Sequence, residues 1–145
     1  MDRRRALRYK RYNELYEWLC KDSKCYYCGM PADTKDHIPS LHYIDNVGLE
    51  EVIKQGLQLW LVSSCSECNS LLSKDSKTIK ENIRYLYNKL QERYDKILNQ
   101  PMWDEEELEE LDEGYLKDYI QLSTDIQCMI HKRLEYMEDL HYDII

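Results

Sequence analysis

Long hydrophobic runs are absent from this sequence of 145 residues. No apolar stretch approaches the roughly 18 residues that a membrane-spanning helix needs, so a membrane span is excluded. The first residues also lack the apolar segment of a signal peptide, and we therefore expect a cytoplasmic protein that is not exported. Because the cytosol keeps thiols reduced, six cysteines in such a chain favour metal binding or catalysis over disulfides.

Phenylalanine is absent too, whereas tyrosine occurs thirteen times. Tyrosines at helical spacing belong more often to a core or an interface than to a platform for stacking bases. We also find no internal repeat, and the length suits one functional unit rather than two independent cores.

A net positive charge is missing, since the formal charge at pH 7 is −8. This argues at first against a nucleic-acid partner, because neutralisation of phosphates normally supplies most of the affinity. The distribution changes that reading: residues 1–24 and 74–100 are net basic (+4 and +3), whereas residues 25–73 and 101–145 are net acidic (−4 and −11). Basic segments therefore flank the central region, and the acidity belongs mainly to the tail.

The central region is expected to contain a β-hairpin. Residues 3–19 ahead of it have the periodicity of an amphipathic helix. Glycine and proline in residues 25–40 indicate a turn and then a short strand, and the apolar residues 57–62 indicate the second strand. The long connection between them is expected to contain a short helix at 48–55, and helix signals return at residues 66–72.

The remainder of the chain is expected to be helical. A helix over residues 76–99 begins with a capping box from Thr78 to Glu81 and ends before Pro101. Residues 104–113 form an acidic helix, and a final helix covers residues 115–141. The residues of this last helix that should face inward are Leu116, Tyr119, Ile126, Ile130 and Met137.

The four cysteines of two Cys-x-x-Cys pairs can surround one zinc ion. A spacer of two residues lets both sulfurs of a pair turn toward the same ion, and four thiolates complete a tetrahedral site. The alternatives are a disulfide, a redox pair or chance. A four-sulfur site has no open coordination position, so this zinc should hold the fold without taking part in catalysis. The predicted ligands are Cys25, Cys28, Cys65 and Cys68, while Cys20 and Cys128 have the pattern of core residues.

Asp36, His37 and Asn69 are the candidates for catalysis beside this zinc. An imidazole can take a proton from water at neutral pH, which makes His37 the expected general base. A carboxylate and an amide oxygen suit a hard ion, so Asp36 and Asn69 are the expected ligands of a catalytic Mg²⁺ or Mn²⁺. The alternatives are that His37 caps the hairpin and that Asn69 caps a helix. His42 is expected in a surface loop, with contact to phosphate or metal as the alternative, and His131 and His141 are expected on the surface of the last helix.

The order of these motifs resembles the HNH, or ββα-metal (His-Me finger), endonucleases, and most closely the phage recombination endonuclease VII branch. The resemblance rests on Cys25-Tyr26-Tyr27-Cys28-Gly29, Lys35-Asp36-His37-Ile38-Pro39 and Cys65-Ser66-Glu67-Cys68-Asn69, within residues 25 to about 75. It implies a hairpin and a helix around the catalytic metal, a structural zinc, and sequence-tolerant cleavage of DNA. The resemblance also implies His37 as base and Asp36 and Asn69 as metal ligands.

The chain departs from the family at two places. Many HNH domains have an asparagine shortly before the second cysteine pair, where it orients the catalytic histidine, and Trp60 stands at the comparable place here. In the endonuclease VII branch an acidic residue follows the asparagine by about one helical turn, and here that turn reads Ser70-Leu71-Leu72-Ser73.

We therefore expect an α+β fold with three segments. These are a basic N-terminal helix (1–24), a zinc-bound nuclease core (25–75) and a helical extension (76–145) with the acidic segment 104–113. The side chains expected to contact DNA are Arg3, Arg4, Arg8, Arg11, Lys74, Lys77, Lys80 and Arg84, although a solvated helix face is an alternative for them.

The function expected is metal-dependent endonuclease activity on DNA. The alternatives are a non-catalytic zinc module that binds nucleic acid or protein, and a nuclease held in a larger phage assembly by its acidic tail. That tail can also be a simple solvated helix, a docking surface for a basic partner, or a brake that competes with DNA. A homodimer is a reasonable arrangement for an enzyme that cuts two strands, although the sequence indicates no interface.

Overall fold

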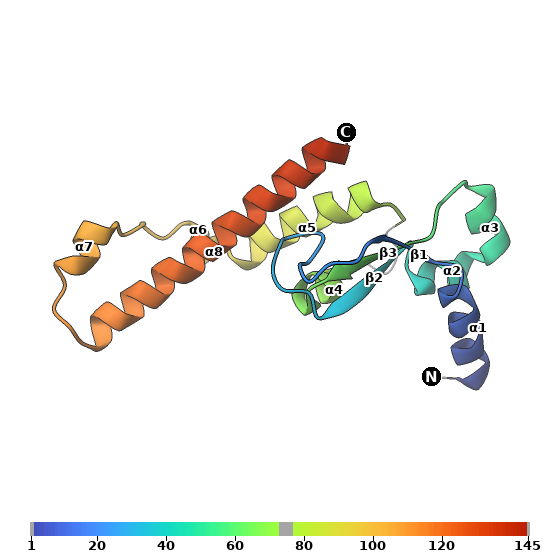
Figure 1. Cartoon of the computed structure of the whole chain (residues 1–145), viewed down its shortest axis with the longest axis horizontal. Helices are drawn as coiled ribbons and strands as arrows, with labels where there is room; N and C mark the ends of the chain where they lie inside the picture. Colours follow the sequence, from blue (N-terminus) through green and yellow to red (C-terminus); the bar gives the residue numbers. More distant parts are fainter. Residues whose placement is uncertain (1, 73–76, 145) are drawn as a thin grey trace.

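A three-stranded sheet lies at the centre of the molecule, with helices on both of its faces and a long helical arm to one side (Figure 1). This computed structural model describes residues 2–72 and 77–144. Strand β3 (Trp60–Ser64) is central; β1 (Glu17–Cys20) pairs with it in parallel, and β2 (Thr34–Ile38) pairs with it antiparallel. The mixed α+β class expected from the sequence is confirmed.

The sheet separates two hydrophobic clusters. Asp36 lies opposite Val62 and His37 lies opposite Leu61 in the β2–β3 register, and successive side chains of a strand point to opposite faces. Val62 belongs to the larger cluster, which includes the four paired cysteines and the long C-terminal helices. Leu61 belongs to the smaller cluster, which is formed with Tyr16 and the helices between β2 and β3. Neighbouring residues of β2 therefore face different cores.

Two helices fill the connection from β2 to β3. Helix α3 (Leu49–Lys54) was predicted, and α2 (Leu41–Val47) was not. The hydroxyl of Ser40 caps α2 by accepting the backbone N–H of Tyr43 at 3.0 Å, so a capping signal was present in the sequence. Helix α4 (Ser66–Leu71) follows β3 directly, as expected.

The predicted helix over residues 3–19 is too long. Helix α1 (Arg3–Asn13) ends at Asn13, and residues 17–20 form β1 instead. Trp18 has good strand propensity, and the backbone of this segment pairs with β3, so pairing with the sheet overrides the helical periodicity.

The C-terminal helices follow the prediction with one break. The hydroxyl of Thr78 accepts the backbone N–H of Glu81 at 3.2 Å, which confirms the cap of α5 (Ile79–Arg93). The expected single helix is interrupted at Tyr94, after which α6 covers Asp95–Leu98. Helix α7 (Glu105–Glu109) is shorter than the acidic segment, and α8 (Tyr115–Ile144) is the longest helix. Within the described ranges, no helix is both long and apolar enough to span a membrane.

The two halves of α8 differ in burial. Ile130 and Met137 are buried as predicted, and Ile126 packs at the edge of the same cluster. Leu116 and Tyr119 were expected to face inward but are 64% and 61% exposed. The N-terminal half of α8 reaches past the ends of α5 and α6 toward α7, so no long helix covers it (Figure 1).

Candidate functional site

The four paired cysteines gather at one buried point between the sheet, α4 and α8. Cys25 and Cys28 precede β2, Cys65 directly follows β3, and Cys68 lies in α4. Their sulfur atoms all lie within 4.8 Å of one another, and those of Cys28 and Cys65 are 3.7 Å apart. Sulfurs bound tetrahedrally at 2.3 Å from zinc would be about 3.8 Å apart. The four side chains can therefore hold a single metal ion such as zinc.

Local backbone structure shapes both cysteine pairs. In the first pair the N–H of Cys25 donates to the carbonyl of Met30 at 2.6 Å, and Gly29 turns the chain with a φ of +78°. A side chain at Gly29 would also meet the ring of Tyr136 at 3.1 Å. In the second pair, Sγ of Cys65 accepts the N–H of Cys68 at 3.4 Å and caps α4. Both pairs are thus held in place by the surrounding chain.

Arg133 of α8 is a neighbour of this cluster that no sequence pattern indicated. It is 5% exposed, its Nη2 lies 4.0 Å from Sγ of Cys68, and its Nη1 lies 2.5 Å from a carboxylate oxygen of Glu67. Burial alone would lower the pKa of this guanidinium, but the sulfur of Cys28 and the Glu67 carboxylate raise it. A buried cation therefore faces the thiolates from the far end of the chain.

Asp36 lies on the face of β2 that points to the larger cluster. It is 8% exposed, and one carboxylate oxygen accepts the hydroxyl of Tyr27 at 2.5 Å and Nδ2 of Asn82 at 3.4 Å. Burial raises the pKa of Asp36 to about 6, and the hydrogen bond from Tyr27 offsets part of that rise. Two more polar atoms, Oδ1 of Asn82 and Oγ of Ser64, are buried without a partner among the described residues. The sequence prediction missed Tyr27 and Asn82.

His37 lies on the opposite face of the same strand. Its Nε2 is 2.6 Å from Oδ1 of Asn13, and its ring meets that of Tyr16 edge-on with 4.8 Å between centroids. Burial lowers the pKa of His37 to about 4, with a smaller contribution from the cation of Lys35. The imidazole is therefore neutral at pH 7.

Asn69 is placed on the Asp36 side of the sheet. It lies in α4, and its Nδ2 donates to Oγ1 of Thr34 at 3.4 Å. Thr34 is two residues before Asp36 and so shares its face of β2. The structure thus brings Asp36 and Asn69 to one side of the sheet and His37 to the other, so the three candidate residues do not share one face.

Most of the predicted DNA-contacting residues that the structure describes lie in α1 and α5, and Lys77 lies just before α5. Arg3, Arg4 and Arg11 are exposed on α1, whereas Arg8 is bound to Asp45 with 2.7 Å between Nε and Oδ1. The side chain of Lys77 lies over the ring of Tyr43, 5.3 Å from its centroid. Lys80 and Arg84 are exposed on α5, and Lys74 lies outside the described residues.

The other predicted residues have simpler environments. His42 is exposed, although it lies in α2 and not in a loop, and His131 and His141 are half-buried on α8. Cys20 and Cys128 are half-buried and not fully in the core.

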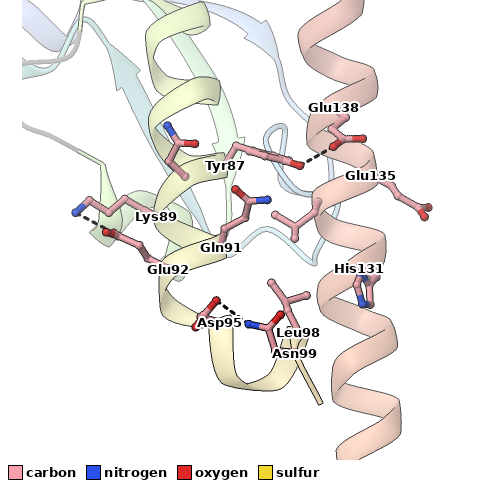
Figure 2. A pocket seen from close by; sticks show the side chains of 12 residues that line it. Tyr87, Lys89, Gln91, Glu92, Asp95, Leu98, Asn99, His131, Glu135 and Glu138 are labelled. Carbon is pink, nitrogen blue, oxygen red and sulfur yellow. Dashed lines mark hydrogen bonds and ion pairs between the residues drawn. The ribbon is translucent and has the colours of Figure 1, made fainter. Parts of the chain in front are cut away.

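A large groove lies away from all three candidate catalytic residues. It has a volume of about 990 Å³ and runs between α5, α6 and α8, as Figure 2 shows. Glu92, Asp95, Glu135 and Glu138 contribute to its lining, so its charge disfavours a phosphate backbone. The groove gives no support to a nuclease site.

Comparisons with protein-family models, with curated proteins and with solved structures find no match for this chain.

Proposed function

We propose that this protein is a metal-dependent DNA endonuclease of the HNH type, stabilised by a structural zinc. The observation that supports this most is the order β2, β3, α4, in which an antiparallel strand pair runs directly into a helix. That order places Asp36 and Asn69 on the same side of the sheet, next to the four cysteines. The resemblance to HNH nucleases implies this side for the metal, but it also implies His37 beside the metal, whereas His37 lies on the opposite face of β2.

Each side chain would have a distinct role. Neutral His37 would take a proton from water, and the resulting hydroxide would attack phosphorus as the bond to the leaving oxygen breaks. Asp36 and Asn69 would hold Mg²⁺ or Mn²⁺, which supplies stabilisation of negative charge on the phosphate. The four cysteines would fill every coordination position of their zinc, so that this ion would stabilise the fold without taking part in catalysis.

The positions of the two basic helices are consistent with DNA as the substrate. Asn13 at the end of α1 contacts His37, and Asn82 near the start of α5 contacts Asp36. Helix α1 therefore contacts this pair through its last residue and α5 contacts it near its start, from opposite sides of the sheet. A DNA backbone that passes β2 could also contact the exposed cations of either helix.

A second candidate is a zinc module that binds nucleic acid without cutting it. The burial of Asp36 behind Tyr27 and Asn82 favours this function, because a carboxylate so enclosed is not open to a hydrated ion. The nuclease requires this small polar cluster to open, and it requires the metal and His37, which lie on opposite faces of β2, to reach the same phosphate.

A cleavage assay separates the two candidates. We expect the zinc-loaded protein with Mg²⁺ or Mn²⁺ to cut duplex, branched or single-stranded DNA. His37→Ala should lower the rate by about 10²–10⁴-fold, because a positioned general base contributes that much. His42→Ala, at an exposed histidine of α2, is the matched control and should cut at the wild-type rate.

Two results would count against the nuclease. Cleavage by His37→Ala at the wild-type rate would remove the assigned base. If the folded, zinc-loaded protein shifts DNA in a gel but cuts none of the three substrates, the binding module is the better account.

A further inference from the structure

The geometry points to Asn13 as the residue that positions His37 for proton transfer. Oδ1 of Asn13 lies 2.6 Å from Nε2 of His37. An amide oxygen can only accept, so this contact holds the neutral ring with its proton on Nε2 and its lone pair on Nδ1. Nδ1 is then the atom that receives the proton from water, an assignment that rests on the proposed function.

The surroundings of the ring agree with a fixed orientation. Tyr16 meets the imidazole edge-on, with an interplanar angle of 84°, and its hydroxyl donates to the carbonyl of Pro39. Asn13 and Tyr16 belong to one turn, because the N–H of Tyr16 donates to the carbonyl of Asn13 at 3.3 Å. Among the described residues, no hydrogen bond engages Nδ1 of His37.

Asn13 also links the basic helix to the histidine. It is the last residue of α1, the helix that carries Arg3, Arg4 and Arg11. Any shift of α1 would therefore move the acceptor of the His37 ring. If the contact only packed α1 against the sheet, a hydrogen-bond acceptor facing Nε2 of His37 would not be required.

Two substitutions distinguish these roles. Asn13→Leu keeps the approximate size of the side chain and removes the acceptor, whereas Asn13→Asp keeps an acceptor oxygen at the same place. Asn88→Leu, at an exposed asparagine of α5, is the control for the chemical change itself. If Asn13→Leu does not fold, Asn13→Ala replaces it.

Proton NMR reads the contact without any activity. We expect a slowly exchanging imidazole proton in the wild type and in Asn13→Asp, assigned by its loss in His37→Gln. The proton should exchange rapidly in Asn13→Leu and persist in Asn88→Leu. Rapid exchange in the wild type would overturn the positioning role, whether or not the protein cuts DNA.

Kinetics then tests the catalytic consequence. Asn13→Leu should lower kcat by about 10–100-fold, as loss of an orienting hydrogen bond does, with KM changed less than about twofold. Asn13→Asp should recover most of this loss. Equal kcat in Asn13→Leu and wild type, or no recovery in Asn13→Asp, would reduce Asn13 to a structural contact. If the wild type cuts no DNA, the proposed function fails, and the NMR result alone decides whether Asn13 fixes the ring.

Discussion

Asp36 and His37 are sequence neighbours whose pKa values are shifted in opposite directions by burial. Burial disfavours the charged form of each, so the pKa of Asp36 rises to about 6 and that of His37 falls to about 4. As pH falls from 7 to 5, folded Asp36 takes up a proton before its unfolded counterpart, which stabilises the fold. Over the same range unfolded His37 takes up a proton and folded His37 does not, which destabilises the fold.

Single substitutions should separate these opposing effects. Relative to the wild type without added Mg²⁺, Asp36→Asn should be more stable at pH 7 by up to about 3 kcal/mol and should lose this advantage toward pH 5. His37→Gln should instead gain about 1–2 kcal/mol relative to the wild type as pH falls, an amount reduced by the partial exposure of the ring. The midpoints of urea unfolding between pH 5 and 7.5 measure both effects. Comparing each variant with the wild type at the same pH cancels the contribution that the cysteine thiolates make to the pH dependence. The assigned pKa shifts are wrong if the stabilities of both variants, relative to the wild type, change in the same direction as pH falls.

Arg133 and Arg93 bind the same carboxylate from different environments. Arg133 is buried between Glu67 and the cysteine cluster, whereas Arg93 is half-exposed, with 3.2 Å between its Nε and Glu67. Removing a buried cation leaves its anionic partners without compensation.

We therefore expect unequal effects from the same substitution. Arg133→Met should cost about 3–5 kcal/mol in the free energy of unfolding, and Arg93→Met less than about 1 kcal/mol. Urea unfolding of the zinc-loaded proteins measures the difference. Equal losses in the free energy of unfolding would mean that Arg133 stabilises the fold no more than an exposed ion pair does. Its position beside the thiolates would then contribute nothing.

At the scale of elements, the cysteines join β2, β3 and α4, which are too short to be stable alone. Strands of five residues and a helix of six cannot bury enough surface without a cross-link. We expect one zinc per chain by elemental analysis, and a strong chelator should lower the melting temperature and release the hairpin. Cys28→Ser should reproduce this loss, while Cys128→Ser, outside the cluster, should not. Unchanged melting after complete removal of zinc would contradict the structural role.

Much of this local architecture could be predicted because its signals are local. The spacing of the cysteines, the glycine and proline of the first turn, and the Thr78 cap each act within a few residues. The site was harder, since Asn13, Asn82 and Arg133 approach β2 and the cysteines from distant parts of the chain. No periodicity in the sequence specifies such tertiary contacts.

The incorrect predictions have the same origin. Residues 17–20 carry a helical pattern, but hydrogen bonds with β3 make them a strand. Leu116 and Tyr119 continue the apolar pattern of α8 beyond the point where α5 and α6 end, so they have no core to face. Periodicity identifies an apolar side of a helix without showing whether another element covers it.

Helix α8 should accordingly tolerate change in one half only. Met137→Ala should cost about 2–5 kcal/mol, because it opens a cavity in the larger cluster. Leu116→Ala should change stability by no more than about 0.5 kcal/mol, since the side chain is already exposed. Thermal and urea unfolding measure both. A large loss in Leu116→Ala would show that its half of the helix is covered in solution.

At the scale of the whole molecule, opposite charges lie at opposite ends. Figure 1 shows the basic helix α1 at one end of the long axis and the acidic helix α7 near the other. Ile130, Leu134 and Met137 belong to the larger cluster, so the acidic tail cannot be deleted from residue 101 without removing part of the core. Neutralisation of α7 is therefore the cleaner way to test the tail.

Distance decides what the acidic helix can do to DNA binding. Charges separated by more than the Debye length, about 8 Å at physiological salt, are largely screened, so α7 should not compete with DNA at α1 in the same molecule. Changing Glu105, Glu106, Glu107 and Glu109 to glutamine should strengthen DNA binding clearly at low salt, and by less than about threefold at about 150 mM salt.

Changing Arg3, Arg4 and Arg11 to glutamine should weaken binding and reduce the slope of log affinity against log salt by up to about 0.9 for each phosphate that is no longer neutralised. Fluorescence anisotropy over a salt series measures both sets. If the α7 variant gains as much DNA affinity at physiological salt as the α1 variant loses, the acidic tail does restrain DNA binding. That result would contradict the screening expected from the distance between α7 and α1.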